Sequence, residues 1–216
     1  MSSEIFEAIR SGDVGRVSAL VAEQPALARE CDQNGVSAIM QARYQGRADI
    51  VQLLRPVIGN LDIFEAATLG DTARLKQLLA GDPSLVQSYS SDGFTPLHLA
   101  SFFSQPDAAA ELLRHGADPN AVATNGTKLA VIHSAAASGN KEVVKLVLEA
   151  GANPNAQQEG GYTALHSAAM RKNIEMVRAL LEAGADPAIS TNDGRTARDF
   201  GGEEVAALPR ASASAQ

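Results

Sequence analysis

Large aromatic and sulfur-bearing side chains are scarce in this chain of 216 residues. It contains no tryptophan, six phenylalanines, three tyrosines and a single cysteine. Cys31 alone cannot form an internal disulfide, so no covalent cross-link stabilises the fold, and the chain suits a reducing compartment. No apolar run approaches the ~18 residues that a membrane span needs. We therefore expect no membrane partner.

Positive charge is also in short supply. The chain has 18 lysines and arginines against 25 aspartates and glutamates, a formal net charge of −7. Binding to a phosphate backbone depends on clustered basic residues, so we expect no nucleic-acid partner. Met1-Ser2-Ser3-Glu4 is not a basic segment followed by an apolar stretch, as an export signal would be, and we expect a cytoplasmic protein.

The chain does contain a sequence motif that recurs at a nearly fixed period. Residues 92–100, Asp-Gly-Phe-Thr-Pro-Leu-His-Leu-Ala, return in altered form at 130–136 and 161–169. The histidines of the three copies, His98, His133 and His166, stand 35 and 33 residues apart. A period in this range indicates a stacked repeat array.

The amino-terminal half holds a second regularity, with an offset of 58 residues. Ile5-Phe6-Glu7-Ala8 matches Ile63-Phe64-Glu65-Ala66, and the correspondence continues to 34–40 against 92–98. The first half therefore reads as one two-repeat unit copied in tandem. Each copy opens with a repeat that lacks the Thr-Pro-Leu-His phrase.

Local chemistry predicts where the helices start and stop. A threonine hydroxyl at Thr95 can accept from an unpaired amide, and Pro96 suits the first helical position. After the later second helices come Gly116, Gly151 and Gly184, which can adopt the left-handed conformation that ends a helix, each with a proline three residues on. Helices this short are marginal alone in water, so stacking has to stabilise them.

The phrase Gly93-x-Thr95-Pro96-Leu97-His98-x-Ala100, a leucine-rich second helix and the closing His115-Gly116-Ala117-Asp118-Pro119-Asn120 together resemble the ankyrin repeat family, most clearly over residues 91–200. The resemblance implies an all-α solenoid with short β-hairpin-like loops. The register predicts about six helix pairs and a partial C-terminal capping repeat. We expect one domain at 1–208, with repeats near 3–31, 36–61, 62–90, 94–121, 128–156 and 162–188, a cap at 195–208, and a flexible tail at 209–216.

The repeated histidines are weak candidates for a metal site. Equivalent positions in adjacent helix pairs lie about 8–10 Å apart, whereas zinc needs each nitrogen at ~2.0–2.1 Å. The resemblance implies instead that each histidine bonds the neighbouring loop and the threonine. This structural motif comprises Thr95, His98, His133, Thr163 and His166.

No arrangement of residues predicts catalysis or a cofactor. Cys31 has no histidine in the first three repeats to act as its base. The glycine pairs at 160–161 and 201–202 neither follow a strand nor precede a Lys-Ser/Thr pair, unlike a phosphate-binding loop. We predict a protein that is not an enzyme and needs no cofactor or metal.

Partner recognition remains, and in ankyrin arrays partners dock on the concave face, formed by the hairpin tips and the exposed side of the first helices. Aromatic and arginine anchors supply much of the affinity in protein interfaces. An alternative is that Phe102 or Phe103 fills a gap where Ser104-Gln105-Pro106 replaces the family's glycine turn. The candidate partner-binding residues are Tyr44, Phe94, Phe102, Phe103, Tyr162, Met170 and Arg171.

Two departures from the repeat pattern stand out. Thr127-Lys128-Leu129 carries a two-residue insertion, and we expect the loop at 126–130 to bulge from the concave side as a candidate specificity element. The second repeat ends at residues 56–61 without the Gly-Ala-Asp phrase, so the junction near 56–62 is irregular.

The sequence therefore favours an interaction scaffold or adaptor that binds a folded protein without catalysis. The alternative is an accessory or regulatory subunit that modulates a partner enzyme. We expect a monomer.

Overall fold

The computed structural model describes residues 3–206, and the tail expected at 209–216 lies outside this range. The all-α fold is confirmed, because no strand occurs between residues 3 and 206. The α-helices are α1 (Glu4–Ser11), α2 (Val14–Glu23), α3 (Ala38–Tyr44), α4 (Ala48–Ile58), α5 (Ile63–Leu69), α6 (Thr72–Gly81), α7 (Pro96–Phe102), α8 (Pro106–Arg114), α9 (Val131–Ser138), α10 (Lys141–Glu149), α11 (Ala164–Met170), α12 (Ile174–Glu182) and α13 (Ala197–Ala206). Three short 3₁₀ helices are η1 (Pro25–Arg29), η2 (Pro83–Gln87) and η3 (Glu159–Gly161).

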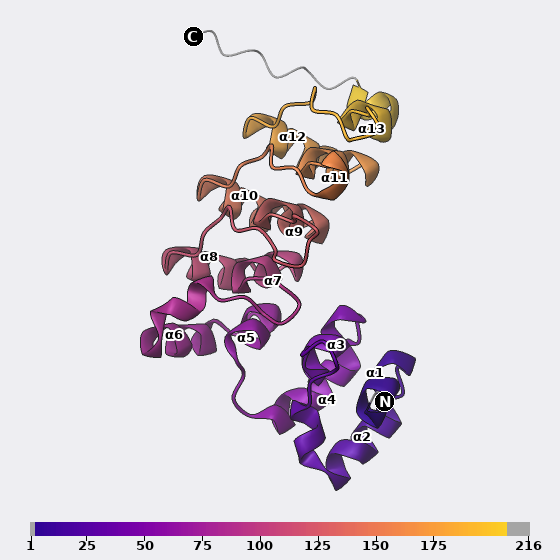
Figure 1. Ribbon diagram of the computed structural model, residues 1–216, viewed down its shortest axis with the longest axis vertical. Coiled ribbons are helices and arrows are strands. Elements are labelled where there is room, and N and C mark those ends of the chain that lie inside the picture. The colour runs from indigo at the N-terminus through magenta and orange to yellow at the C-terminus, as the bar shows by residue number, and fades with distance from the viewer. Residues whose placement is uncertain (1–2, 207–216) are drawn as a thin grey trace.

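The helices stack in two layers along the long axis of the molecule (Figure 1). The odd-numbered helices form one layer, in which α7 packs between α5 and α9, and α11 between α9 and α13. The even-numbered helices form the other layer from α6 through α8 and α10 to α12. We call the exposed side of the odd-numbered helices, with the loops that precede them, the inner-helix face. It corresponds to the face that the sequence analysis called concave.

The loops that precede α3, α9 and α13 are hairpin-like, as expected. Each is closed by one isolated antiparallel bridge: Cys31 with Ser37, Val122 with Ala130, and Ser190 with Thr196. None extends into a strand, because the hairpins pair over only one position.

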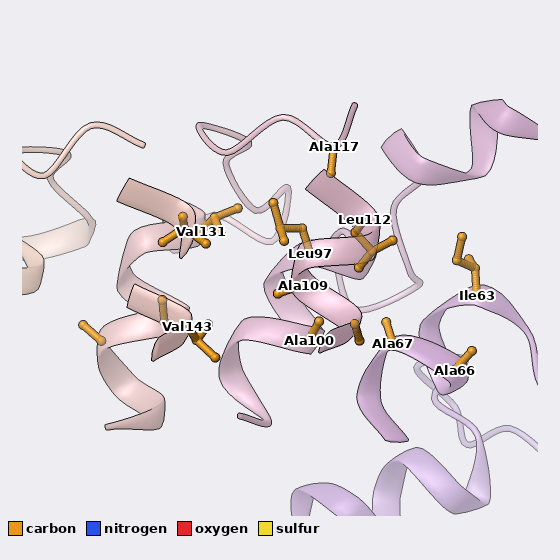
Figure 2. Close-up of a cluster of buried hydrophobic side chains, with 14 of the residues drawn as sticks. Ile63, Ala66, Ala67, Leu97, Ala100, Ala109, Leu112, Ala117, Val131 and Val143 are labelled. Carbon is orange, nitrogen blue, oxygen red and sulfur yellow. The ribbon is translucent and has the colours of Figure 1, made fainter. Parts of the chain in front are cut away.

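One continuous core runs between the layers from Ile5 to Val205. Alanines occupy the contacts between successive inner helices, as Ala67 on α5 and Ala100 on α7 illustrate (Figure 2). Larger side chains such as Leu112 enter from the outer layer. Small residues let the inner helices pack closely, and both layers contribute large apolar side chains to the core, such as Leu97 on α7 and Leu79 on α6.

The turn from inner to outer helix uses the left-handed backbone conformation in every repeat. Glycine adopts it in four turns, for example at Gly139 with φ of 73°. Ser104 and Lys172 adopt it at 58° and 54°, although such angles disfavour residues with a Cβ. The turn at Ser104 therefore has the same backbone conformation as the glycine turns, although it lacks the glycine.

The 58-residue duplication is visible in the local structure. Asp13 caps α2 by accepting from the Arg16 amide at 2.8 Å, and Asp71 caps α6 by accepting from the Arg74 amide at 3.0 Å. The 3₁₀ helices η1 and η2 follow these outer helices at the same offset. The two copies therefore share their caps as well as their sequence.

The copies meet at an irregular junction between α4 and α5. Here α4 and α6 do not pack side by side as α6 and α8 do, and the first four helices tilt away from the rest of the stack (Figure 1). An opening of about 590 Å³ separates α4 from the α5–α6 turn, and the Arg55–Asp71 ion pair of 3.0 Å crosses it. We call this space the outer opening.

On the inner-helix face the same junction is closed. The third repeat lacks a hairpin, so α3 reaches past α5 to the fourth repeat. The Tyr44 hydroxyl donates to Asp92 Oδ2 at 2.7 Å, and Arg43 Nη2 donates to the Phe103 carbonyl at 3.3 Å. The array is therefore bent toward its inner-helix face at this point.

Candidate partner-binding surface

A hollow of about 120 Å³ lies on the inner-helix face where α3, α7 and α9 meet. Most of its surface is carbon. Its lining residues come from three repeats and one inserted loop: Tyr44, Phe94, His98, Leu99, Phe102, Leu129, His133, Ser134 and Ala137. Three of the seven predicted partner-binding residues are therefore brought together here.

Two buried imidazoles contribute to the lining, and each has both ring nitrogens occupied. His98 Nδ1 accepts from the Thr95 amide at 3.3 Å, so Nε2 carries the proton and donates to the Leu129 carbonyl at 3.1 Å. His133 repeats the pattern, with the Ala130 amide at 3.1 Å and the Tyr162 carbonyl at 3.2 Å. Each histidine thus links its own helix start to the next repeat.

His166 closes the series in the same way, through the Thr163 hydroxyl at 2.9 Å and the Arg195 carbonyl at 3.2 Å. Thr95 accepts a bond from the His98 amide at 3.3 Å, and the Thr163 amide donates to His166 Nδ1 at 3.1 Å. Threonine and histidine therefore act together at these helix starts.

Burial keeps these imidazoles neutral. Removal from water penalises the charged form and lowers the pKa of His98 from 6.5 to about 4. The same cause lowers the pKa of His133 and of His166. At neutral pH the hollow therefore presents neither a positive charge nor a free imidazole donor.

One wall of the hollow is the ring of Tyr44, contributed by α3 from two repeats away. Its hydroxyl is occupied by Asp92, whose other carboxylate oxygen accepts from the Ser90 hydroxyl at 2.5 Å. Burial and this carboxylate raise the pKa of Tyr44 above its usual range. The phenol therefore stays protonated and turns its polar end away from a docked group.

Phe102 and Phe103 are adjacent in sequence but differ in their surroundings. Phe102 forms an outer wall of the hollow and is 44% exposed. Phe103 is half-buried behind it, 5.4 Å from the Tyr44 ring and under the Arg43 guanidinium at 5.0 Å. Phe102 is thus available to a partner, while Phe103 mainly supports the junction.

Three inner helices present the same position side by side along the face. Phe102 on α7, Ala137 on α9 and Met170 on α11 are each the seventh residue of their helix. Met170 is 47% exposed, and the small Ala137 leaves a notch between the two large side chains. Arg171 donates from Nη1 to the Ala137 carbonyl at 2.7 Å, which places its positive charge beside the notch.

The remaining two predicted residues contribute less exposed surface. Phe94 is half-buried in the hollow, 5.8 Å from the His98 ring. Tyr162 lies outside it and packs 5.8 Å from the ring of Phe200 on α13. The seven residues therefore form a hollow with a row beside it, and Tyr162 belongs mostly to the packing of the C-terminal cap.

The inserted loop contributes directly to the site. Lys128 adopts a left-handed φ of 56°, which turns the chain so that the Leu129 carbonyl meets His98 and the Leu129 side chain lines the hollow. The Thr127 carbonyl accepts from the Glu159 amide at 3.0 Å, so this loop also contacts the next hairpin.

The seven candidate residues leave out four lining residues, Leu99, Leu129, Ser134 and Ala137. Leu129 lies in the loop at 126–130, which the sequence indicates as a candidate specificity element. Ala137 is not a candidate because its side chain is small where those of its neighbours are large. Among the side chains that the structure describes, no three from His, Cys, Asp or Glu are placed to hold a metal ion. No helix in the described part of the chain is long and apolar enough to cross a bilayer.

Comparison with known families agrees with this architecture. A model described as ankyrin repeats (3 copies) matches residues 5–123, and one described as ankyrin repeats (many copies) matches residues 132–181 and 165–200. These matches cover more than half of the chain and both of its halves.

Curated relatives match through about half of this chain. Rat ankyrin repeat and SAM domain-containing protein 6 is 35% identical over 103 residues, 48% of this chain and 12% of the relative. Human neurogenic locus notch homolog protein 4 is 37% identical over 103 residues, 47% and 5% of the two chains. The E3 ubiquitin-protein ligase KEG of Arabidopsis thaliana is 33% identical over 133 residues, 56% and 8%. The chain therefore matches only a small part of each of these proteins.

Proposed function

Because this chain belongs to the ankyrin repeat family, whose repeats generally mediate protein–protein interaction, we propose that it is a non-catalytic adaptor that binds a folded protein through its inner-helix face. The observation that carries the proposal is the apolar hollow, with the exposed Phe102 and Met170 beside it. Large apolar side chains left exposed together on one face mark interaction sites in many proteins. Hot spots in such interfaces are few and clustered, as these residues are.

The proposal includes the setting and extent of the protein. Residues 1–208 act as one domain, since a single core cluster joins the first helix to the last. The protein works as a monomer in the cytoplasm. The exposed, unpaired Cys31 suits that reducing compartment.

The test is affinity capture from the source cell's lysate with the intact chain and with a Phe102→Ala, Met170→Ala variant. Both substitutions remove exposed side chains, so the helical circular dichroism should stay unchanged. We expect a protein retained by the intact chain and lost by the variant, and a purified one-to-one complex by analytical ultracentrifugation.

The matched control is Tyr89→Ala, which removes an aromatic side chain of similar exposure, 43%, from the segment after η2. This variant should capture as well as the intact chain. Equal capture by all three proteins would exclude the inner-helix face as the docking site.

A second role is an accessory or regulatory subunit of an enzyme, which the relative named as a ubiquitin ligase favours. The two roles differ in what binding does to a captured enzyme. Under the adaptor proposal its kcat and KM stay unchanged when the chain is added, and under the second they change.

A further inference from the structure

We propose that the hollow receives one leucine, methionine or phenylalanine side chain from a partner segment that also carries a carboxylate for Arg171. This inference rests on the proposed function and adds the chemistry of the partner. It follows from the size of the hollow, the state of its polar groups and the charges at its mouth.

The size of the hollow limits the occupant to one side chain. A cavity of about 150 Å³ in another protein binds benzene, so a hollow of about 120 Å³ with an open mouth holds a group of that class. A leucine, methionine or phenylalanine side chain fits, and two such groups or a long acyl chain do not.

The polar atoms in the lining offer little to a polar occupant. Both ring nitrogens of His98 and of His133 are already hydrogen-bonded, and the Tyr44 hydroxyl is directed to Asp92. A hydroxyl or amide placed there would lose its water without gaining a partner, which is costly. The site therefore selects an apolar side chain.

The positive charge of Arg171 beside the hollow selects an acidic neighbour. Arg171 bonds the Ala137 carbonyl at the edge of the hollow, and Lys128 precedes the lining residue Leu129. Neither cation forms an ion pair with any side chain that the structure describes, although Glu159 lies on the adjoining loop. Asp92, the carboxylate nearest to Tyr44, is occupied by two hydroxyl donors.

The local charge beside the hollow is positive, whereas the net charge of the whole chain is −7. A partner segment attracted by the net charge would be basic. A partner segment recognised by this site would carry aspartate or glutamate close to its apolar anchor. The two expectations are therefore separable by experiment.

The test is selection of random twelve-residue peptides displayed on phage against the purified intact chain. We expect enriched peptides with one leucine, methionine or phenylalanine and an acidic residue within three positions of it. Enrichment of basic peptides, of peptides without an apolar anchor, or of none would overturn the inference.

Variants of the chain then show where the selected peptide binds. Ala137→Leu puts a side chain into the hollow and should weaken binding at least tenfold. Arg171→Glu should also weaken it at least tenfold, and replacing the acidic residue of the peptide by lysine should restore binding to this variant. The control Arg178→Glu makes the same charge change on the outer helix α12 and should alter the Kd less than twofold.

Phe102→Ala separates failure of this inference from failure of the proposed function. Suppose that the selected peptides no longer bind the Phe102→Ala variant but still bind the Ala137→Leu and Arg171→Glu variants. The inner-helix face would then remain the docking site, but the proposed apolar anchor in the hollow and the proposed carboxylate partner of Arg171 would both be wrong. Circular dichroism checks that each variant is folded, and if Ala137→Leu does not fold, loss of binding in Phe102→Ala together with the charge swap decides the result.

Discussion

At the scale of single residues, the imidazole of His98 joins two repeats without carrying a charge. One nitrogen accepts from the amide of Thr95, and the other donates to the Leu129 carbonyl of the following loop. Protonation would put a charge on a ring that is removed from water, and the new Nδ1–H would face the Thr95 amide, with only the Thr95 hydroxyl at 2.8 Å able to accept from it. Burial therefore makes the neutral ring a requirement of the stable fold.

This requirement predicts that acid destabilises the protein before its carboxylates titrate. The pKa of His98 is 6.5 as a free group and about 4 when folded, so its contribution is complete above pH 6.5 and is lost as the pH falls toward 4. By pH 5 the loss from His98 is about 2 kcal/mol. His133 and His166 act in the same direction, while burial raises the pKa of Glu65 and opposes them.

Urea unfolding at pH 7.5 and pH 5.0 measures this loss, and NMR titration of the His98 ring measures its pKa directly. The free energy of unfolding should be lower at pH 5.0. An unchanged value, or a His98 ring that titrates near pH 6.5, would show that protonation is compatible with the folded state.

At the scale of elements, the turns between inner and outer helices offer a matched comparison. Gly139 has a φ of 73° and no heavy atom within 4 Å of the position that a Cβ would take. Gly139→Ala therefore tests the backbone conformation alone and should cost about 1 kcal/mol of stability.

The reverse change is available in the same turn of another repeat. Lys172→Gly relieves the left-handed strain at φ of 54°, but it also frees the unfolded chain, so we expect a gain below ~1 kcal/mol. Thermal unfolding of both variants measures the difference. A stabilising Gly139→Ala would contradict the assigned turn conformation.

The two duplicated helix caps should differ in how much they contribute to stability, because only Asp71 also forms an ion pair. Asp13→Ala removes a hydrogen bond to a helix start and should cost about 1 kcal/mol. Asp71→Ala removes the equivalent bond and also the ion pair with Arg55, so it should cost about 1.5 kcal/mol. Asparagine caps as well as aspartate, so Asp13→Asn should be nearly neutral. Asp71→Asn also loses the ion pair with Arg55 and should cost about 0.5 kcal/mol.

Urea unfolding midpoints of the four variants decide between these effects. Equal midpoints for the two asparagine variants would mean that the ion pair across the outer opening contributes nothing.

At the scale of the whole molecule, stability in a stacked array is a sum over repeats and their nearest-neighbour interfaces. The interface between the second and third repeats lacks the α4–α6 packing, so α1 to α4 should open at lower free energy than α7 to α11. Native-state hydrogen exchange should show two groups of amides with this division.

Tyr44→Phe sharpens the same prediction, since it removes the bond to Asp92 and keeps the ring. Exchange should speed up in α1 to α4 and stay unchanged in α9 to α11, whereas the control Tyr89→Phe should affect neither. A single uniform exchange class across the array would contradict a weak junction.

Sequence periodicity predicted the solenoid because each helix pair repeats its own caps, turns and core residues. The bend at the junction was not predictable, since it depends on how α3 packs once the third hairpin is missing. The hollow was predictable only in part. Tyr44, Phe94 and Phe102 are large and lie at exposed positions of the repeat, but their meeting point depends on that bend and on the turn at Lys128.

The bend also gives the molecule a mechanical weak point. Under a load applied between its two ends, every interface in the array would carry the same force, and the junction would yield first because its outer layer is interrupted and, among the described side chains, only the Arg55–Asp71 pair crosses the opening there. The first rupture would detach α1 to α4 together, before the stack linked by His98, His133 and His166 extends. A partner seated against Tyr44 and Phe102 would bridge that point and act as a splint, so tension and binding would oppose each other in this protein.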